Sequence, residues 1–274
     1  MIKNNYFKKI FNCVSVSLLL VILGYSLIQS VEFDSATTDE AIHILSGYLA
    51  NNNNNFTIDP EHPFLAKRIY TLPLQIIQPY VNFQDKLFTS ANDFFYDSWS
   101  ETREAANNFL YNWGNDADII LFYSRITGII FTILFAFIFW YVTKKNFSAL
   151  AGFFALLLFV FCPNILAHAR LANTDIWYTG AYFFVVWAYV NYLFKITNIK
   201  SQKLFNRLKF IILPGLMLGF ALAVKFSSLT LPIILASLAL TYYFFNNKKN
   251  KFWPYFWQKL LDFILMGLIG FVVV

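Results

Sequence analysis

The chain has 274 residues, of which 58% are hydrophobic and only 13% are charged, whereas a soluble domain carries about 25% charged residues. This composition excludes a water-soluble globule and predicts an all-α polytopic membrane protein. The formal net charge of +6 does not indicate nucleic-acid binding, because Lys and Arg are dispersed over short gaps between apolar segments and form no basic groove.

The first apolar segment runs from about Ile10 to Gln29 and follows Lys3, Lys8 and Lys9. It is long for a signal peptide, and no clear cleavage site follows it. We therefore predict a signal-anchor helix whose N-terminus lies in the cytoplasm.

A long loop, residues 30–118, follows this helix and holds thirteen of the fifteen carboxylates. Within it, Phe64–Val81 is apolar but is interrupted by prolines and by Lys67 and Arg68, which predicts a helix in the membrane interface or re-entering it. Asn51–Asn55 is a polar low-complexity turn and predicts a flexible connector.

The second part of the chain, residues 119–274, is a series of apolar segments. The run from Phe210 to Phe245 would form a helix about 54 Å long, too long for a hydrocarbon core of about 30 Å, so we predict two short spans with a bend near Lys225–Ser228. The other spans are expected at about 119–142, 148–167, 176–194 and 257–274, which makes about seven in all.

The distribution of charge predicts the orientation. With this topology, fourteen Lys and Arg lie on the cytoplasmic side, whereas seven Lys and Arg and fourteen carboxylates lie outside. The long loop would then face away from the cytoplasm in an inner-membrane protein. Since the last apolar run is cut short, we expect the chain to be the N-terminal part of a longer protein, and the 274 residues to form one module.

Three polar residues open the loop: Asp39, Glu40 and His43. In a helix they would share one face, because they are three and four positions apart. Such a group can act as a general base, hold an acceptor hydroxyl or bind a divalent cation. The alternative is a helix cap at Thr38 or Asp39 followed by a solvated helix.

Further candidates lie at the predicted interface. His62 and Lys67 begin the apolar segment of the loop, and Lys67 could bind a lipid phosphate or simply extend to the headgroups. His168, Arg170 and Asp175 share a short outside connection, where Arg170 could bind phosphate or pair with Asp175 to close the loop.

Lys225 is a single cation inside a long apolar run. A charge within a membrane is costly, so such a residue is a functional candidate, the alternative being a lysine that extends to the interface at a turn.

The order of these motifs resembles that of the polytopic GT-C glycosyltransferases with lipid-phosphate sugar donors, in particular the dolichyl-phosphate-mannose–protein mannosyltransferase-like bacterial proteins. Nearly the whole chain is covered by the likeness. It is carried by DEAIH (39–43) with Gly47-Tyr48, DPEHPFLAKRIYTLPL (59–74), PNILAHARLANTD (163–175) and GLMLGFALAVKFSSLTLP (215–232). One departure is His62-Pro63-Phe64, where the family commonly has His-Pro-Pro.

The resemblance implies a module of many transmembrane helices whose first outside loop carries interfacial helices. It implies inverting transfer of mannose or a similar hexose from a polyprenyl-phosphate to a hydroxyl acceptor, a protein or a glycolipid. Asp39 would be the general base and Glu40 would help to hold acceptor or sugar. Lys67 and Arg170 would bind the donor phosphate, and Lys225 is a further candidate for that role.

The supporting residues would be His43, His62, His168 and Asp175. The resemblance leaves a divalent cation, Mg²⁺ or Mn²⁺, open, with Asp39 and Asp175 as its ligands.

Two other functions are compatible with the sequence. A transporter or flippase of a lipid-linked glycan would use Arg170 and Lys225 to bind phosphate during passage. A truncated, catalytically silent membrane protein would use none of these residues.

Overall fold

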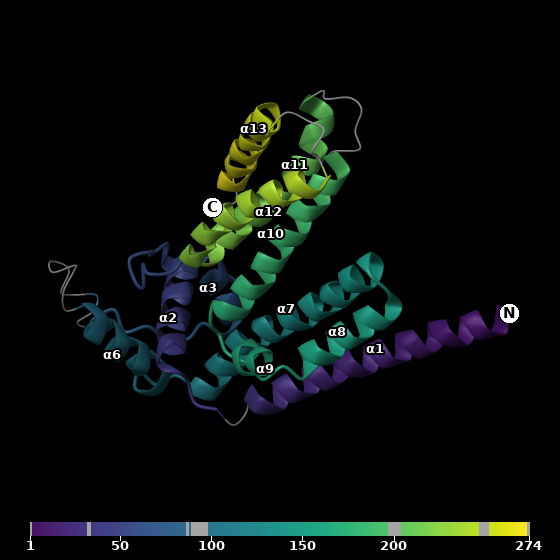
Figure 1. Ribbon diagram of the computed structural model, residues 1–274. Coiled ribbons are helices and arrows are strands. Elements are labelled where there is room, and N and C mark those ends of the chain that lie inside the picture. The colour runs from purple at the N-terminus through teal and green to yellow at the C-terminus, as the bar shows by residue number, and fades with distance from the viewer. Residues whose placement is uncertain are drawn as a thin grey trace. The chain divides into compact units, whose positions relative to one another are not determined.

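The computed structural model describes residues 2–31, 34–85, 88, 98–196, 204–246 and 252–272. These residues form helices joined by short loops, and no β-strand occurs among them (Figure 1), which confirms the all-α prediction. The helices are α1 (Ile2–Val31), α2 (Thr38–Asn53), α3 (Phe64–Thr71), α4 (Leu74–Ile77), α6 (Ser98–Tyr111), α7 (Ala117–Asn146), α8 (Ala149–Val160), α9 (Pro163–Ala169), α10 (Asp175–Ile196), α11 (Leu204–Val224), the 3₁₀ helix η1 (Phe226–Thr230), α12 (Leu231–Asn246) and α13 (Phe252–Phe271).

Within the described residues, four helical segments are long and apolar enough to cross a membrane, namely Cys13–Val31, Ala117–Asn146, Arg207–Val224 and Phe226–Asn246. The bent pair α8 and α9 would be a fifth. Helices α10 and α13 coincide with predicted spans but are not among these segments; Tyr and Trp are frequent in α10, and α13 contains Lys259 and Asp262. The chain therefore has the helices of a multi-pass membrane protein, and the total of seven spans stays a prediction.

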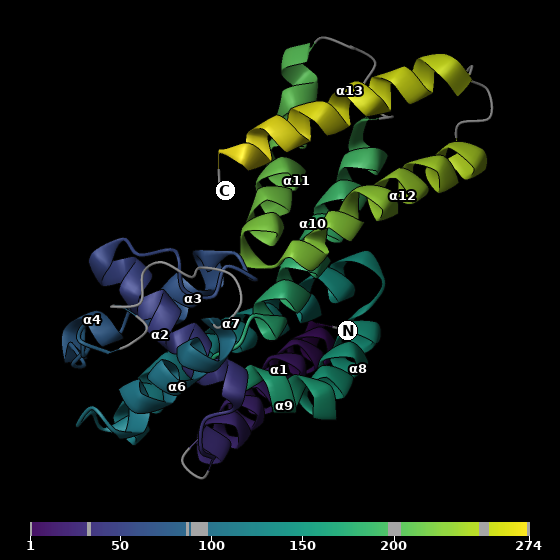
Figure 2. The same cartoon turned by 90° about the vertical axis from the view of Figure 1, so that its left-hand side faces the viewer.

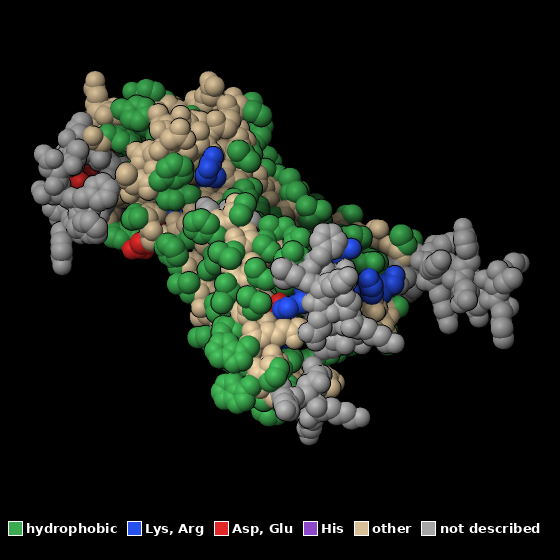
Figure 3. All heavy atoms as spheres, turned by 90° about the horizontal axis from the view of Figure 1, so that it is seen from above, with side chains coloured by type: hydrophobic (Ala, Val, Ile, Leu, Met, Phe, Trp, Pro, Cys, Tyr) green, Lys and Arg blue, Asp and Glu red, His purple; other side chains and the backbone are tan. Residues whose placement is uncertain are grey.

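The surface agrees with a membrane environment. Large hydrophobic side chains such as Leu158, Ile233 and Phe245 are more than two-thirds exposed. Figure 3 shows hydrophobic side chains spread over much of one face with few charged residues between them. In water such exposure would be unfavourable, whereas in lipid it costs nothing.

The chain divides into two compact units. The first comprises residues 1–60 and 66–176, and the second comprises residues 61–65 and 177–274. Apart from residues 61–65, the described part of the long loop thus belongs to the same unit as helices α7 to α9.

In the first unit, α1, α7 and α8 pack against one another and α2 packs against α6. The predicted span 148–167 is divided into α8 and α9, which meet at an angle of 59°. Pro163 explains the break, because a residue before proline is disfavoured in helical geometry and Cys162 is extended at φ −72°, ψ 117°. Pro163 then occupies the first turn of α9, where its missing N–H is tolerated.

The second unit contains most of α10 together with α11, η1, α12 and α13, around an apolar core that includes Val185, Leu218, Leu235 and Met266. The predicted bend is confirmed: α11 ends at Val224 and Lys225 is extended at φ −153°, ψ 136°. Ser228 Oγ and the Lys225 N–H both donate to the carbonyl of Ala221, at 2.6 and 3.1 Å, so the break leaves that carbonyl well satisfied.

Helix α13 crosses α11 (Figure 2), and glycines of both helices lie at the contact. A Cβ on Gly219 would lie only 2.2 Å from the carbonyl oxygen of Gly270, so the two backbones touch directly. Small residues at such crossings are typical of helix packing in membranes, where van der Waals contact replaces the hydrophobic effect.

We predict that Gly219→Ala destabilises the second unit by about 1–3 kcal/mol, because the new methyl group forces the two backbones apart. Gly267→Ala is the matched control, since a Cβ on Gly267 of α13 would meet no atom within 4 Å. Denaturant titration of the two variants in the same detergent measures the difference, and equal stability of both would contradict the tight crossing.

Candidate functional site

The first turn of α2 carries the candidate acidic pair. Thr37 is the N-cap, and its N–H donates to Glu40 Oε2 at 3.3 Å in a capping box. A cap is therefore present one residue before the predicted position. The helix that follows is not solvated, because every residue from Glu40 to Ala50 is buried. The alternative of an exposed helix is wrong.

Glu40 is wholly buried and forms a bidentate ion pair with Arg125 of α7. Arg125 Nε lies 2.8 Å from Oε1, and its Nη2 lies 2.8 Å from Oε2. The N–H of Ala172 also donates to Oε1 at 2.8 Å. Both carboxylate oxygens of Glu40 are thus occupied by protein donors.

Arg125 extends this link to the end of α1. Its remaining N–H groups donate to the carbonyls of Val31, Asp34 and Ser35 at 3.2, 2.8 and 3.1 Å. One buried guanidinium therefore ties together the chain after α1, the start of α2 and α7. The sequence-based assignment counted Arg125 only as an outside charge, although a single Arg in an apolar segment was a signal of a buried partner.

Asp39 differs from its neighbour in that it is exposed. Among the described residues it has no hydrogen bond or ion pair, so its carboxylate is open to a ligand. Nearby, Arg103 of α6 donates to Thr38 Oγ1 at 3.2 Å, which places an unpredicted exposed cation beside the first turn of α2.

His43, Asp59 and Lys67 form a buried cluster. His43 Nδ1 and Lys67 Nζ lie 2.6 and 2.7 Å from Asp59 Oδ2, and Lys67 Nζ also donates to the Asp59 carbonyl at 2.6 Å. Asp59 adopts a left-handed backbone conformation with φ 57°, which is uncommon outside glycine. The three side chains hold the loop before α3 against α2.

The electrostatics of this cluster favour an ionised Asp59. Burial by itself raises the pKa of Asp59, but the contact with His43 and the charges of His43 and Lys67 outweigh burial and lower the pKa below 3.8. In Tyr70, burial and then the charges of Asp59 and Glu40 raise the pKa well above 10.0, so this phenol stays neutral.

Lys67 therefore neither extends to the lipid headgroups nor lies free to bind a phosphate, the two environments expected from the sequence. It is completely buried and committed to Asp59, so an extended lysine at the headgroups is excluded and a direct phosphate contact would require it to leave Asp59. The sequence could not show this, because the spacing of Lys67 in α3 does not reveal that Asp59 folds over it.

Helix α3 approaches α2 closely enough for this cluster because of Gly47. A Cβ at Gly47 would lie 2.4 Å from the carbonyl oxygen of Lys67. Asn51 donates to the Arg68 carbonyl and to Thr71 Oγ1 at 2.9 and 3.0 Å. The flexible connector predicted for 51–55 is wrong over its first half, since α2 continues through Asn53 and Asn51 anchors α3.

The connection after α9 is closed by a pair other than the predicted one. His168 Nδ1 lies 3.3 Å from Asp175 Oδ2, and both side chains are nearly half exposed. Arg170 instead pairs with Asp34 and is about one-third exposed. Because the N–H of Ala172 donates to Glu40 Oε1, the loop between α9 and α10, which contains Arg170, is held against the first turn of α2.

Two candidates, His62 and Lys225, belong to the second unit. His62 lies in the turn before α3, partly buried. Lys225 caps η1 in the second unit, with its Nζ 6.0 Å from the centre of the Tyr178 ring. Of the predicted residues, the structure brings together Asp39, Glu40 and the connection of Arg170, and separately His43 and Lys67.

A site for a divalent cation needs several ligands close together. Within the residues that the structure describes, no three His, Cys, Asp or Glu side chains gather in an arrangement that could hold a metal ion. Asp39 is exposed and the Asp175 carboxylate lies 3.3 Å from His168 Nδ1, so a cation held by these two residues stays a prediction.

We predict that Arg125→Met destabilises the first unit by about 3–5 kcal/mol, because Glu40 would be left as a buried, unpaired carboxylate. Arg103→Met removes an exposed cation from the same unit and should change stability by less than about 0.5 kcal/mol. Denaturant titration in detergent checks both, and similar values for the two variants would contradict the structural role of Arg125.

We also predict an acid-sensitive contribution from Asp59. Because its pKa is lower in the folded protein, its contribution to the free energy of unfolding is complete above about pH 3.8 and is lost as the pH falls through the lower, folded value. Asp59→Asn should lack this loss, whereas Glu104→Gln, at an exposed carboxylate of α6, should keep it. The measurement is unfolding free energy against pH, and an unchanged acid slope in Asp59→Asn would refute the assignment.

No protein-family model, no curated protein and no solved structure matches the chain. The resemblance to GT-C glycosyltransferases therefore depends on the four motifs and their order. The geometry of the described residues carries the functional argument.

Proposed function

We propose that the chain is a membrane glycosyltransferase that moves mannose or a similar hexose from a polyprenyl-phosphate carrier to a hydroxyl group of a protein or glycolipid. The observation that carries the proposal is the contrast within the acidic pair. Asp39 is exposed without a partner among the described residues, and Glu40 beside it is buried and held from three sides. A reactive carboxylate needs this kind of rigid support.

In the proposed reaction, Asp39 accepts the proton of the acceptor hydroxyl. The hydroxyl oxygen forms a bond to the anomeric carbon of the sugar, on the face opposite the carrier. The bond between that carbon and the phosphate oxygen breaks, the electron pair stays on the lipid phosphate, and the configuration is inverted. General-base catalysis of this kind typically contributes about 10²–10⁴-fold in rate.

Glu40 is a positioning residue in this scheme rather than a ligand of sugar or acceptor. Its two oxygens already accept four hydrogen bonds, two from Arg125 and one each from the N–H groups of Ala172 and Thr37, so no lone pair is left for a substrate. It holds the first turn of α2, and therefore Asp39, against α7. It also holds the connection that carries Arg170.

Arg170 is the better candidate for the donor phosphate. It is partly exposed and paired with the partly exposed carboxylate of Asp34, which the singly charged phosphodiester of the donor could replace. Guanidinium binding would stabilise the negative charge that develops on the leaving phosphate. Lys67 does not contact the substrate in this scheme. It neutralises Asp59, which in turn holds His43 on the buried face of α2.

The membrane placement follows the charge bias. The proposed enzyme lies in the cytoplasmic membrane with its N-terminus inside and Asp39 outside, so donor and acceptor meet at the outer face. The apolar helices support contact with a lipid carrier.

We predict that Asp39→Asn lowers transfer at least about 100-fold without affecting insertion, because the amide cannot accept the proton. The measurement uses membranes that contain the full chain and a panel of radiolabelled polyprenyl-phosphate sugars. Asp118→Asn is the matched control, since Asp118 is another exposed carboxylate in the first turn of a helix, α7, and its loss should leave transfer unchanged.

Three outcomes decide against the proposal or against parts of it. Full activity of Asp39→Asn removes Asp39 from the role of base. Failure of the unmodified chain with every donor overturns the proposed activity. Movement of a labelled carrier across the bilayer without sugar transfer indicates a transporter instead.

A further inference from the structure

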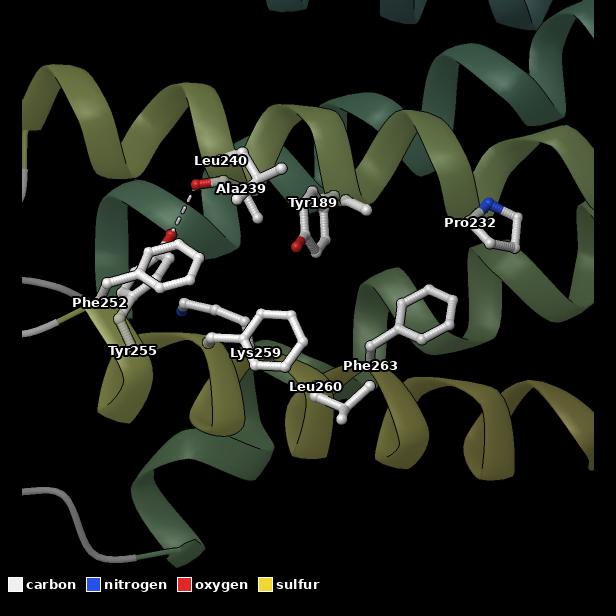
Figure 4. A pocket seen from close by; sticks show the side chains of 11 residues that line it. Tyr189, Pro232, Ala239, Leu240, Phe252, Tyr255, Lys259, Leu260 and Phe263 are labelled. Carbon is white, nitrogen blue, oxygen red and sulfur yellow. Dashed lines mark hydrogen bonds between the residues drawn. The ribbon is translucent and has the colours of Figure 1, made fainter.

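An apolar cavity lies within the second unit, between α10, α12 and α13 (Figure 4). Its volume is about 180 Å³, and its lining includes Tyr189, Pro232, Leu240, Tyr255, Lys259 and Phe263. Apolar cavities of about 150 Å³ stay dry and accept molecules of the size of benzene. This cavity is therefore large enough for a segment of a hydrocarbon chain.

The rim of the cavity faces the outside of the unit. Leu240, Phe256 and Leu260 line it and are 41%, 37% and 38% exposed, respectively. If these helices lie in a bilayer, the cavity opens toward lipid and not toward water. The molecules present at its mouth are then lipid chains.

Lys259 is the charged residue in this lining. It is only 8% exposed, and its ammonium lies between the rings of Tyr192 and Tyr255, at 4.4 and 5.5 Å. It donates one hydrogen bond, to Tyr192 Oη at 2.7 Å. Within the described residues its other two donors have no hydrogen-bond acceptor, which is unfavourable for a buried ammonium.

The carboxylate near Lys259 is already shared. Asp262 lies 4.0 Å from Lys259 Nζ, and it also pairs with Arg207 and accepts a hydrogen bond from the Tyr192 hydroxyl. Two cations thus share one carboxylate. In the sequence, Asp262 is the sole carboxylate after Asp175, whereas ten Lys and Arg follow that residue. The chain after Asp175 therefore has many more cations than carboxylates, and Asp262 alone does not neutralise both Lys259 and Arg207.

The surrounding aromatic residues indicate the depth of Lys259. Trp253, Tyr255 and Trp257 occupy the first turns of α13, and Tyr242 and Tyr243 lie near the end of α12. Trp and Tyr gather where headgroups meet hydrocarbon. Lys259 lies about 10 Å along the helix from Phe252, so its ammonium is within reach of a headgroup phosphate while the cavity beside it is at the depth of acyl chains.

We propose that this cavity binds one anionic phospholipid, with an acyl chain between α10, α12 and α13 and the phosphate against Lys259. The apolar lining fits the chain, and the anion supplies the charge that Asp262 alone does not. By the predicted orientation the site belongs to the cytoplasmic leaflet, where anionic lipids are available. It is independent of the transfer chemistry proposed for Asp39.

The test is lipid titration of the full chain in a nonionic detergent, with bound lipid counted by native mass spectrometry. Phosphatidylglycerol is the anionic probe and phosphatidylcholine the zwitterionic one. We expect one phosphatidylglycerol to bind tightly, and Lys259→Gln to weaken its binding about tenfold. Lys195→Gln is the control, because it removes the same charge from an exposed position of the same unit and should leave binding unchanged.

A second variant separates the acyl chain from the charge. Ala236→Phe places a ring in the cavity from α12 and leaves Lys259, Asp262 and Arg207 untouched, so it should abolish the tight phosphatidylglycerol site. Lys259→Arg keeps the cation and should retain binding. These two variants decide the matter if Lys259→Gln fails to fold.

Several results would overturn the proposal. Phosphatidylcholine binding as tightly as phosphatidylglycerol would remove the role of charge. Unchanged binding by Ala236→Phe, or equally tight binding of glycerol phosphate, which has no acyl chain, would remove the role of the cavity.

Discussion

The buried ion pair between Glu40 and Arg125 is the constraint on which the first unit depends. A carboxylate and a guanidinium removed from water are costly unless every remaining donor and acceptor is satisfied. Here the surplus donors of Arg125 reach three carbonyls after α1, and Glu40 accepts a further N–H from Ala172. The same condition that makes the pair tolerable therefore joins four stretches of chain and determines where Asp39 is exposed.

The buried carboxylate of Asp59 is likewise satisfied by protein partners. Its carboxylate receives His43 and Lys67 from two different helices, and close approach at Gly47 permits it. In the second unit the buried cations do not each have a carboxylate partner, because Arg207 and Lys259 share Asp262. Arg125 and Lys67 have carboxylate partners of their own and stabilise the fold, whereas Lys259 shares its carboxylate and can still bind an anionic ligand.

Much of the fold could be predicted from local pattern. The apolar runs gave the positions of α1, α7, α10 and α12, and a 36-residue run that exceeds the membrane thickness required the break at Lys225. Helix in the middle of the loop was also expected, and α3 and α4 occur there. The partners of the charged residues could not be predicted, because Glu40 and Arg125 are 85 positions apart and periodicity reports only neighbours along one helix.

The sequence by itself determined the class of the protein, the helices and the concentration of acid in one loop, since these depend on composition and on local spacing. The tertiary structure alone decided which acids are available. It buried Glu40 and Lys67, left Asp39 exposed and paired Arg170 with Asp34 in place of Asp175. The physical reason is that burial and pairing are set by contacts between distant segments, and a buried charge is defined by its partner rather than by its neighbours in the chain.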